Sequence, residues 1–342
     1  LANLVSGRVG IVRGSTNISM VGLTTAILYA EQRRQFGPPG AETPILDYVT
    51  HQVRLMPLLA TTYAHLFISE RALSDHVAAQ DDMALMKRFH VIISGLKAVA
   101  SWHGSETLQT CREACGGQGF KSSNRIGSLK ADGDIQLTYE GDNYVLLQQV
   151  SRALLRGSAT NESRVQLAGL KTDEEVKNRC DSAYLRCPDA QLRAFTLRES
   201  DLCARLNEEY AAAKASGMNP GDAFQTCAVL AAEAGRAHVE NVVLAEFVAR
   251  ERAAENSLKG PLGMLRSLYA LARMDGSASF LRGQYFGKEK AVMVGKEMVR
   301  LCGEVREVAP QLVRAFRIPD FLLGEIAGDY VAANAYDAVD RP

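Results

Sequence analysis

The chain has 342 residues, of which 47% are hydrophobic and 23% are charged. This length is enough for two domains of ordinary size, and the composition is that of a protein with a packed core. The 39 Lys and Arg residues balance the 39 Asp and Glu residues, so the formal net charge is zero. A neutral chain without a basic block lacks the electrostatic features of a nucleic-acid-binding protein. We therefore expect a soluble protein of the cell interior.

The seven cysteines are scattered and odd in number, which argues against a disulfide framework and favours a reducing compartment. Cys111 and Cys115 have a spacing found in metal sites, but no second Cys or His pair follows them, and the histidines form no HExxH motif. We therefore expect no metal. No apolar run is long enough for a membrane span. Residues 1–5 include no initiator Met and no signal-peptide pattern, so the chain is expected to begin within a longer protein.

Helical periodicity dominates the first half of the chain. The first helix is predicted to stop before Gly37-Pro38-Pro39, because basic residues followed by Gly and Pro are typical of a helix C-terminus. The polar, glycine-containing residues 121–134 predict a loop. Either Asp142 or Asn143 can cap the helix that follows them. Four long helices with short connections predict an antiparallel four-helix bundle. The predicted helices are residues 7–36, 44–79, 82–115 and 143–155.

A second helical region follows a polar linker, predicted at residues 158–186. Breaks are expected at residues 217–221 and at Gly260-Pro261, because Gly and Pro interrupt helices. The expected organisation is all-α, with a first domain at residues 1–157 and a second at 187–342. The helices predicted in the second domain are residues 189–216, 222–256, 262–274, 288–306 and 320–335.

Three short motifs carry a family resemblance. They are Arg33-Arg34-Gln35-Phe36-Gly37, Cys115-Gly116-Gly117-Gln118-Gly119-Phe120 and Tyr139-Glu140-Gly141-Asp142-Asn143. In this order, and on helical elements, they resemble the acyl-CoA dehydrogenase and oxidase superfamily, and Arg8 ahead of them adds a fourth match. Residues 111–117 are similar to the oxidase branch, and residues 140–150 are similar to medium-chain oxidases of plant type. The resemblance is close over residues 1–157, and the second helical region is a feature of oxidases.

This resemblance implies that the N-terminal helical domain and the middle β-domain of the family are absent from the chain. It implies an FAD-dependent acyl-CoA oxidase that converts acyl-CoA to trans-2-enoyl-CoA and passes electrons to O2, giving H2O2, in the first step of peroxisomal fatty-acid β-oxidation. The activity belongs to the complete polypeptide, expected to be a homodimer, and the fragment alone is expected to be inactive. Residues 340–342 are not the Ser-Lys-Leu type of peroxisomal signal.

The resemblance makes Glu140 the catalytic base. An α-C–H beside a thioester is a weak acid, so its removal needs a positioned base and donors aimed at the forming enolate oxygen. Gly141 allows the backbone to approach the substrate without a Cβ, and Arg8 either orients Glu140 or lines the substrate site. From the residues alone, an ordinary surface carboxylate ahead of a helix is the favoured interpretation of Glu140, and Arg8 is equally a solvated side chain.

The resemblance also implies two groups of FAD contacts, the first of which reaches the cofactor of the neighbouring subunit. A guanidinium can hold phosphate oxygens through paired hydrogen bonds. The alternatives are a basic last turn that satisfies free helix carbonyls, and a glycine helix stop. Glu113 is not assigned to the FAD site, because many dehydrogenases of the family have a Gln at this position. The implied contacts are Arg33, Gln35, Phe36, Gly116, Gly117 and Asp142.

Two rival functions remain open at this point. An acyl-CoA dehydrogenase with a C-terminal extension would share Glu140 but pass electrons to a protein acceptor. A catalytically silent helical scaffold used for dimerisation would bind little flavin. Trp102 and His103, on the third predicted helix, are interpreted as packing residues rather than ligands.

Overall fold

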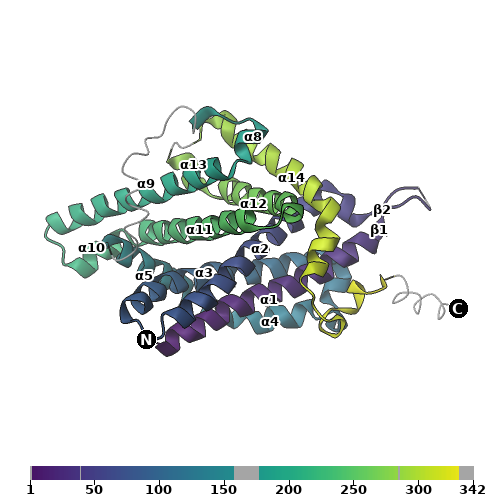
Figure 1. The fold of residues 1–342 in the computed structure, drawn as a ribbon, viewed down its shortest axis with the longest axis horizontal. Coiled ribbons are helices and arrows are strands. Elements are labelled where there is room, and N and C mark those ends of the chain that lie inside the picture. The colour runs from purple at the N-terminus through teal and green to yellow at the C-terminus, as the bar shows by residue number, and fades with distance from the viewer. Residues whose placement is uncertain (1, 39, 158–176, 284–285, 331–342) are drawn as a thin grey trace.

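The structure is a computed structural model, and it describes residues 2–38, 40–157, 177–283 and 286–330. Long α-helices make up most of it (Figure 1), which confirms the all-α prediction. These helices are α1 (Ala2–Gln32), α2 (Val49–Ala78), α3 (Met83–Ala114), α5 (Asn143–Leu155), α9 (Pro188–Ala215), α11 (Ala228–Ala253), α12 (Asn256–Gly276) and α14 (Lys288–Ala315). None of the described helices is both long and apolar enough to cross a membrane.

Shorter elements connect these helices. The only strands among the described residues are β1 (Arg34–Gln35) and β2 (Thr43–Pro44), which pair antiparallel. The short α-helices are α4 (Ile126–Asp134), α8 (Ser182–Leu185), α10 (Pro220–Thr226) and α13 (Ala278–Arg282). Single turns of 3₁₀-helix occur at Ile45–Asp47, Gly116–Phe120, Ser122–Asn124, Ile135–Leu137, Asp320–Leu322 and Glu325–Ala327.

Side-chain caps explain where several helices begin. The Asp82 carboxylate accepts hydrogen bonds from the second and third backbone N–H groups of α3, and Asp142 does the same for α5. Pro188 opens α9, at the position where a missing N–H costs nothing. These starts agree with the predicted helices to within one residue.

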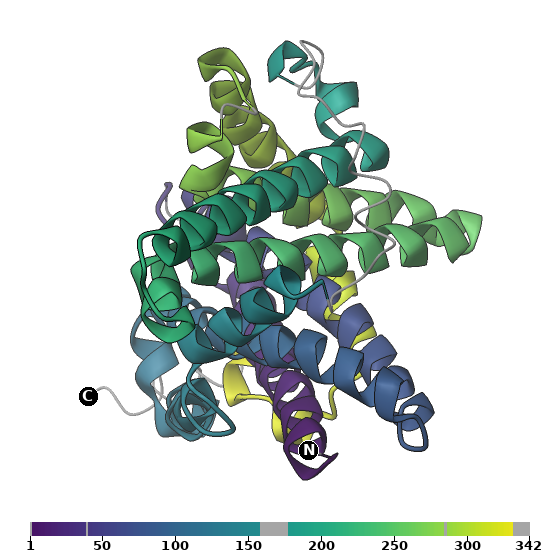
Figure 2. The ribbon, with the colours of Figure 1, turned by 90° about the vertical axis from the view of Figure 1, so that its left-hand side faces the viewer.

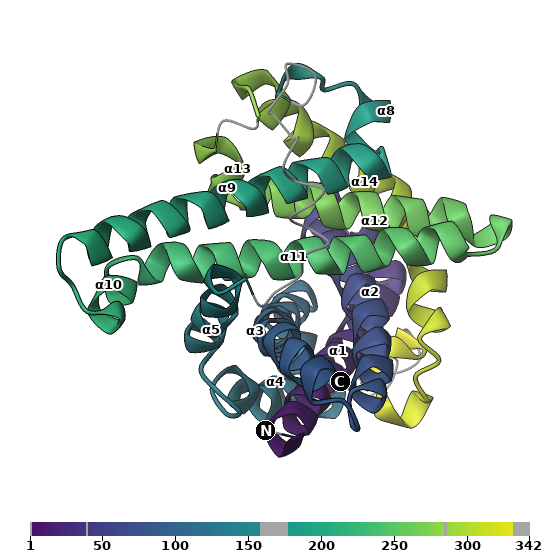
Figure 3. The same ribbon diagram turned by 60° about the vertical axis from the view of Figure 1, so that its left-hand side comes forward.

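The helices of the two halves share one core. Helices α1, α2 and α3 pack on one another, and α5 packs on both α3 and α11. Helix α11 crosses over α2 and α3 (Figure 3), while α12 and α14 pack against α2. Ile27 of α1, Leu59 of α2, Phe247 of α11 and Leu301 of α14 belong to the same buried cluster. The second half therefore covers the first rather than standing apart from it (Figure 2).

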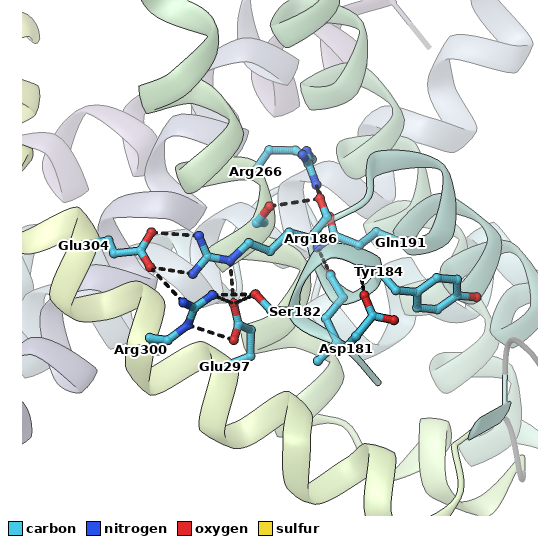
Figure 4. A network of polar contacts seen from close by, with 11 residues as sticks. Asp181, Ser182, Tyr184, Arg186, Gln191, Arg266, Glu297, Arg300 and Glu304 are labelled. Atoms are coloured by element: carbon cyan, nitrogen blue, oxygen red, sulfur yellow. Dashed lines mark hydrogen bonds and ion pairs between the residues drawn. The ribbon is translucent and has the colours of Figure 1, made fainter. Parts of the chain in front are cut away.

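A buried and half-buried ion-pair network ties the chain entering α9 to the later helices (Figure 4). Arg186 pairs with Glu297 at 2.5 Å and with Glu304 at 2.7 Å, both on α14. Arg266 of α12 donates to the backbone carbonyl of Arg186 at 2.9 Å and to the Gln191 side chain of α9. The segment before α9 is thus attached to two helices that follow it by about 80 residues or more.

Five local predictions were wrong, and two of them concern the first half of the chain. Residues 121–134 are not a loop but include helix α4, in which buried Ile126 and partly buried Leu129 face α3. Only these two apolar residues mark the helix, too few for a visible period. The first helix ends at Gln32 rather than at residue 36, because β1 begins at Arg34 and pairs with β2.

The proline-based boundaries were also wrong. Helix α12 continues through Pro261, and the break lies instead at the extended Ala254–Glu255. Helix α14 extends through Pro310 to Ala315 rather than stopping at residue 306. A proline removes one helical hydrogen bond, and packing in the shared core outweighs that loss. The predicted helix at 320–335 is 3₁₀ turns as far as it is described, and residues 331–335 and most of the predicted linker lie outside the described residues.

Candidate active site

The Glu140 turn connects the 3₁₀ turn Ile135–Leu137 to α5. Glu140 has a left-handed backbone (φ 57°), as does Gly141 (φ 117°). A Cβ on Gly141 would lie 2.9 Å from the Leu146 side chain, so only glycine fits there. A left-handed non-glycine residue costs free energy and persists only where its surroundings hold it. Two buried cations do so here.

Arg8 holds the turn from α1. It is 6% exposed, and its Nε donates to the Glu140 carbonyl at 3.0 Å while Nη1 donates to Ser94 at 2.8 Å. Nη1 also lies 3.4 Å from His90 Nδ1, and the other ring nitrogen of His90 meets Gln149 of α5. Burial lowers the pKa of Arg8, and the charge of Glu140 opposes this shift. The interpretation of Arg8 as a solvated side chain was wrong.

Lys97 holds the turn from α3. It has no exposed surface, and its Nζ donates to the carbonyl of Gly141 at 2.7 Å, to the carbonyl of Leu137 at 3.3 Å and to Asn143 Oδ1 at 2.9 Å. Asn143 is itself bonded to Ser101. Burial lowers the pKa of Lys97 to about 8, despite the opposing charges of nearby carboxylates. Sequence reasoning missed Lys97, since a lone Lys in a helix carries no local signal of burial, and it gave Asn143 only as a motif member and a possible helix cap.

The Glu140 carboxylate is left available by this arrangement. Its Oε2 is buried and has no hydrogen-bond partner among the described residues. Its Oε1 faces Gly7 of α1, where an added Cβ would lie 2.7 Å away. A buried carboxylate oxygen without a donor is energetically unfavourable, so this oxygen is open to a partner that the described residues do not supply. The turn therefore presents a carboxylate suited to act as a base.

The Arg33 motif lies at the opposite end of α1, on the β1–β2 hairpin. Arg33 donates to Gln35 Oε1 at 2.8 Å, and Tyr48 donates to the Gln35 carbonyl at 2.9 Å. Phe36, with φ 62°, is 71% exposed and contacts the Tyr48 ring edge-on at 6.2 Å. The hairpin thus holds the Phe36 ring outward from the helical body, and the half-buried Arg33 guanidinium lies at its base.

The glycine motif follows the C-terminus of α3. Gly116 is left-handed (φ 57°), and a Cβ on either Gly116 or Gly117 would meet no atom within 4 Å. Gly119 differs, because its Cβ would lie 2.0 Å from the Arg112 carbonyl. Gly116 and Gly117 therefore expose open backbone, whereas Gly119 is required by the close approach of two chain segments. Sequence reasoning did not single out Gly119.

A C-terminal segment, residues 320–330, braces both motifs. The Ile326 N–H donates to Asn124 Oδ1 at 3.2 Å, beside the glycine motif. The Tyr330 N–H donates to Gln32 Oε1 at 3.0 Å, and its ring lies 5.8 Å from the Arg33 guanidinium. The two motifs are therefore held at one end of the molecule by residues far away in sequence.

The structure keeps this end apart from Glu140. Gly7, which contacts Glu140, and Gln32, which precedes the Arg33 motif, lie at opposite ends of α1 (Figure 1). At about 1.5 Å per residue the helix separates them by about 38 Å. Of the predicted site residues, Arg8, Glu140, Gly141 and Asp142 come together in one group. Arg33, Gln35, Phe36, Gly116 and Gly117 form the other.

Three further residues have identifiable partners. Asp142 uses Oδ1 to accept the Tyr144 and Val145 N–H groups as the N-cap of α5. Glu113, left out of the predicted site, pairs with Arg54 at 3.2 Å. Trp102 contacts the Tyr144 ring, and the buried His103 bonds to Thr62 at 2.8 Å, so both pack between helices as predicted.

Known proteins resemble this chain over its whole length. The peroxisomal acyl-coenzyme A oxidase 3 of Arabidopsis thaliana is 39% identical, over 99% of this chain and 51% of its own length. The crystal structure of acyl-CoA oxidase 1 from Yarrowia lipolytica has a TM-score of 0.87 at 27% identity, over 99% of this chain and 55% of that one. Acyl-CoA oxidase-1 of Caenorhabditis elegans, solved with FAD and ATP, shows the same fold (TM-score 0.88, 22% identity, 99% and 54% covered).

Family models give the same assignment. The model described as acyl-CoA oxidase, C-alpha1 domain, matches residues 1–155, and the one described as acyl-CoA oxidase matches residues 187–330. The chain spans about half the length of the relatives it matches. On these matches, and on a fold shared over its full length, the chain belongs to the acyl-CoA oxidase family and corresponds to its C-terminal helical portion.

Proposed function

We propose that the complete polypeptide is an FAD-dependent acyl-CoA oxidase of the peroxisome, in which this chain supplies the catalytic base. The enzyme removes two hydrogens from acyl-CoA to give trans-2-enoyl-CoA, and O2 is reduced to H2O2, as in the first step of fatty-acid β-oxidation. The observation that carries this proposal is the buried, unpartnered Oε2 of the half-buried Glu140, on a backbone held by two cations. Peroxisomal placement rests on the names of the relatives.

Glu140 takes the α-proton of the thioester. The C–H bond breaks, and the proton passes to a carboxylate oxygen that has no competing donor among the described residues. When bound, FAD supplies the acceptor for the hydride that leaves the β-carbon. The Glu140 N–H donates to the thioester carbonyl oxygen, where negative charge develops, and Gly141 leaves room for the substrate beside the turn.

Arg8 and Lys97 act as positioning residues. Neither donates a hydrogen bond to the Glu140 carboxylate, and both hold backbone carbonyls of the turn instead. This leaves the carboxylate free to move its proton while the N–H next to it stays in place. Positioning of this kind lowers the entropic part of an activation barrier. We therefore assign Arg8 to the turn rather than to the substrate.

The exposed motifs fit an extended dinucleotide. Arg33 provides paired donors for phosphate oxygens, Phe36 provides an exposed ring, and Gly116 and Gly117 provide open backbone against which a flat group can lie. Gln35 keeps its amide nitrogen for a ligand. Asp142 fits less well, because Oδ1 is committed to the helix cap, and only Oδ2 could meet a cofactor hydroxyl.

The separation of the two groups of residues supports a homodimer. A cofactor on the Arg33 motif lies about 38 Å from the Glu140 of the same chain, by the length of α1, so that motif serves the site of a second subunit. We further propose the division into a four-helix bundle at residues 1–157, a linker at 158–186 and a second domain at 187–342. Lacking half the length of its relatives, the chain alone is inactive.

Peroxide release tests the proposal. The complete polypeptide is supplied with FAD, O2 and octanoyl-CoA, beside a Glu140→Gln variant. We expect peroxide from the wild type and a loss of at least about 10²–10⁴-fold in the variant, the usual contribution of a general base. A medium-chain preference stays a prediction, checked by replacing octanoyl-CoA with longer and shorter substrates.

The other outcomes separate the rivals. Reduction of bound flavin by octanoyl-CoA without peroxide would indicate a dehydrogenase that uses a protein acceptor. A wild type that neither binds flavin nor oxidises the substrate would indicate a silent scaffold. Equal peroxide from wild type and Glu140→Gln would remove Glu140 from the mechanism.

A further inference from the structure

A small polar cavity lies between the two halves of the chain, and its lining includes no residue of the Glu140 turn. Its volume is about 60 Å³, and its walls come from α2, α3, α11 and α12. The residues that define its chemistry are His65 of α2, Glu106 of α3, Arg236 and Glu240 of α11, and Arg273 of α12. The cavity is therefore closed by helices from both halves.

Two guanidinium groups in this cavity, those of Arg236 and Arg273, act on the nearby Glu240 through their charge but form no direct ion pair with it. Among the described residues, neither Arg236 nor Arg273 has an ion pair or hydrogen bond, and Arg273 Nε is buried without a partner. Arg236 lies over the Trp102 ring at 4.5 Å, which leaves its N–H edges free. Each guanidinium carries five N–H donors, and leaving a half-buried cation unpaired costs free energy.

The carboxylates nearby do not neutralise them. Glu240 is already bound by the buried Arg198 at 2.5 Å, and Glu106 is exposed at the rim. Burial raises the pKa of Glu240, but Arg198, Arg273 and Arg236 outweigh burial and hold it below its usual value. The positive charge of this region thus exceeds what Glu240 alone balances.

The imidazole that lines the cavity is neutral and has a free ring nitrogen. His65 is 4% exposed, and its Nδ1 has no hydrogen-bond partner. Burial, together with the charge of Arg273, lowers the pKa of His65 to about 3. A neutral imidazole can donate one N–H, so the cavity wall offers donors from Arg236, Arg273 and His65.

We propose that this cavity binds one tetrahedral oxyanion, of the class of inorganic phosphate, held by Arg236, Arg273 and His65. On this scale one water needs about 10–15 Å³, so a cavity of about 60 Å³ has room for a small oxyanion but not for a nucleotide or the CoA moiety. An anion there bridges α2 and α3 to α11 and α12. Its binding therefore strengthens the packing of the second half on the first.

The test is phosphate binding by the complete polypeptide. Inorganic phosphate is titrated calorimetrically, and the melting temperature is followed with phosphate or with sodium chloride at equal ionic strength. We expect a saturable rise in melting temperature with phosphate and not with chloride. The Arg273→Gln and Arg236→Gln variants should each bind phosphate at least about tenfold more weakly than the wild type, because each variant loses charge-assisted hydrogen bonds to the anion.

Matched variants keep the result decisive. Arg282→Gln removes an equally charged but exposed side chain from α13, and it should bind phosphate like the wild type. Arg236 is only half-buried, so Arg236→Gln stays informative if Arg273→Gln fails to fold. No phosphate effect beyond that of chloride in the wild type would overturn the proposal. Unchanged phosphate affinity in Arg236→Gln would overturn it equally, by placing the anion elsewhere.

Discussion

At the Glu140 turn, two buried cations hold the backbone, whereas at the other end of α1 the exposed Phe36 follows the first strand of a short hairpin and Arg33 stands just before it. The turn is held within this chain: Arg8 of α1 donates to the Glu140 carbonyl, and Lys97 of α3 donates to the Gly141 carbonyl. The hairpin and the Gly116–Gly117 backbone face open space. The difference indicates that the proposed base is positioned by the chain itself, whereas the proposed cofactor surface needs groups from outside the chain to complete it.

The largest effect is expected from removing the buried Lys97 ammonium, which holds the Glu140 turn from α3. Lys97→Met should leave the Gly141 and Leu137 carbonyls without their donor and lower the free energy of unfolding by about 3 kcal/mol. Urea unfolding and peroxide release of the complete polypeptide measure both consequences. Lys87→Met, an exposed lysine on the same helix, is the control. If the two variants unfold alike, Lys97 does not hold the turn.

Comparing the pH dependence of stability in the wild type and in Lys97→Met sharpens this test. The pKa of Lys97 is lowered by burial to about 8, from 10.5 in the unfolded chain. Between pH 8 and 10.5, Lys97 is therefore protonated to a greater extent in the unfolded state than in the folded state. The contribution of Lys97 to the free energy of unfolding consequently rises with pH over this range. The stability difference between wild type and Lys97→Met should grow over this window by an amount of order 3 kcal/mol. A difference that is constant from pH 7 to 10.5 would contradict burial of the charge.

A second prediction separates positioning from stability at the carboxylate. Gly7→Ala places a methyl 2.7 Å from Glu140 Oε1 and should displace that side chain, with a loss of activity of about 10²-fold. Ala favours a helix over Gly by roughly 1 kcal/mol, so stability should not fall. Gly10→Ala, one turn away with no atom within 4 Å, should keep its activity. Equal activity in both variants would show that the carboxylate does not need this position.

The smallest effect compares two glycines of the outward-facing motif. Gly119→Ala forces apart two backbone segments that are already in contact and should cost about 2 kcal/mol of stability. Gly117→Ala meets open space and should leave stability unchanged, but weaken FAD retention because its methyl lies where the cofactor is proposed. Thermal unfolding and flavin absorbance distinguish the two. A Gly117→Ala variant that retains FAD like the wild type would contradict the cofactor surface.

Sequence reasoning located the features that depend on neighbouring residues. The long apolar periods identify α1, α2 and α3, and the Asp142 or Asn143 cap marks the start of α5, because caps and periods act within one or two turns. It failed where packing against residues distant in sequence determines the local structure. Pro261 and Pro310 lie inside helices because the shared core holds them, and α4 carries too few apolar residues to be recognised.

The same limit applies to the site. Glu140 and Gly141 were identifiable from a short motif, but Lys97 was not, because its partners are 40 or more residues away in sequence. The role of Arg8 likewise depends on a contact 132 residues away. Residues 320–330, which brace both cofactor motifs, were predicted as a helix and carry no motif of their own.

The most direct test of the central account is complementation between two inactive subunits. Glu140→Gln chains and chains with Arg33→Glu are co-expressed with different tags, and the mixed dimer is purified through both. If each Arg33 motif serves the site whose base lies in the partner, the mixed dimer has one intact site and should release about half the peroxide of the wild type. A mixed dimer as inactive as both parents would show that base and cofactor motif serve the same chain, and would contradict the account.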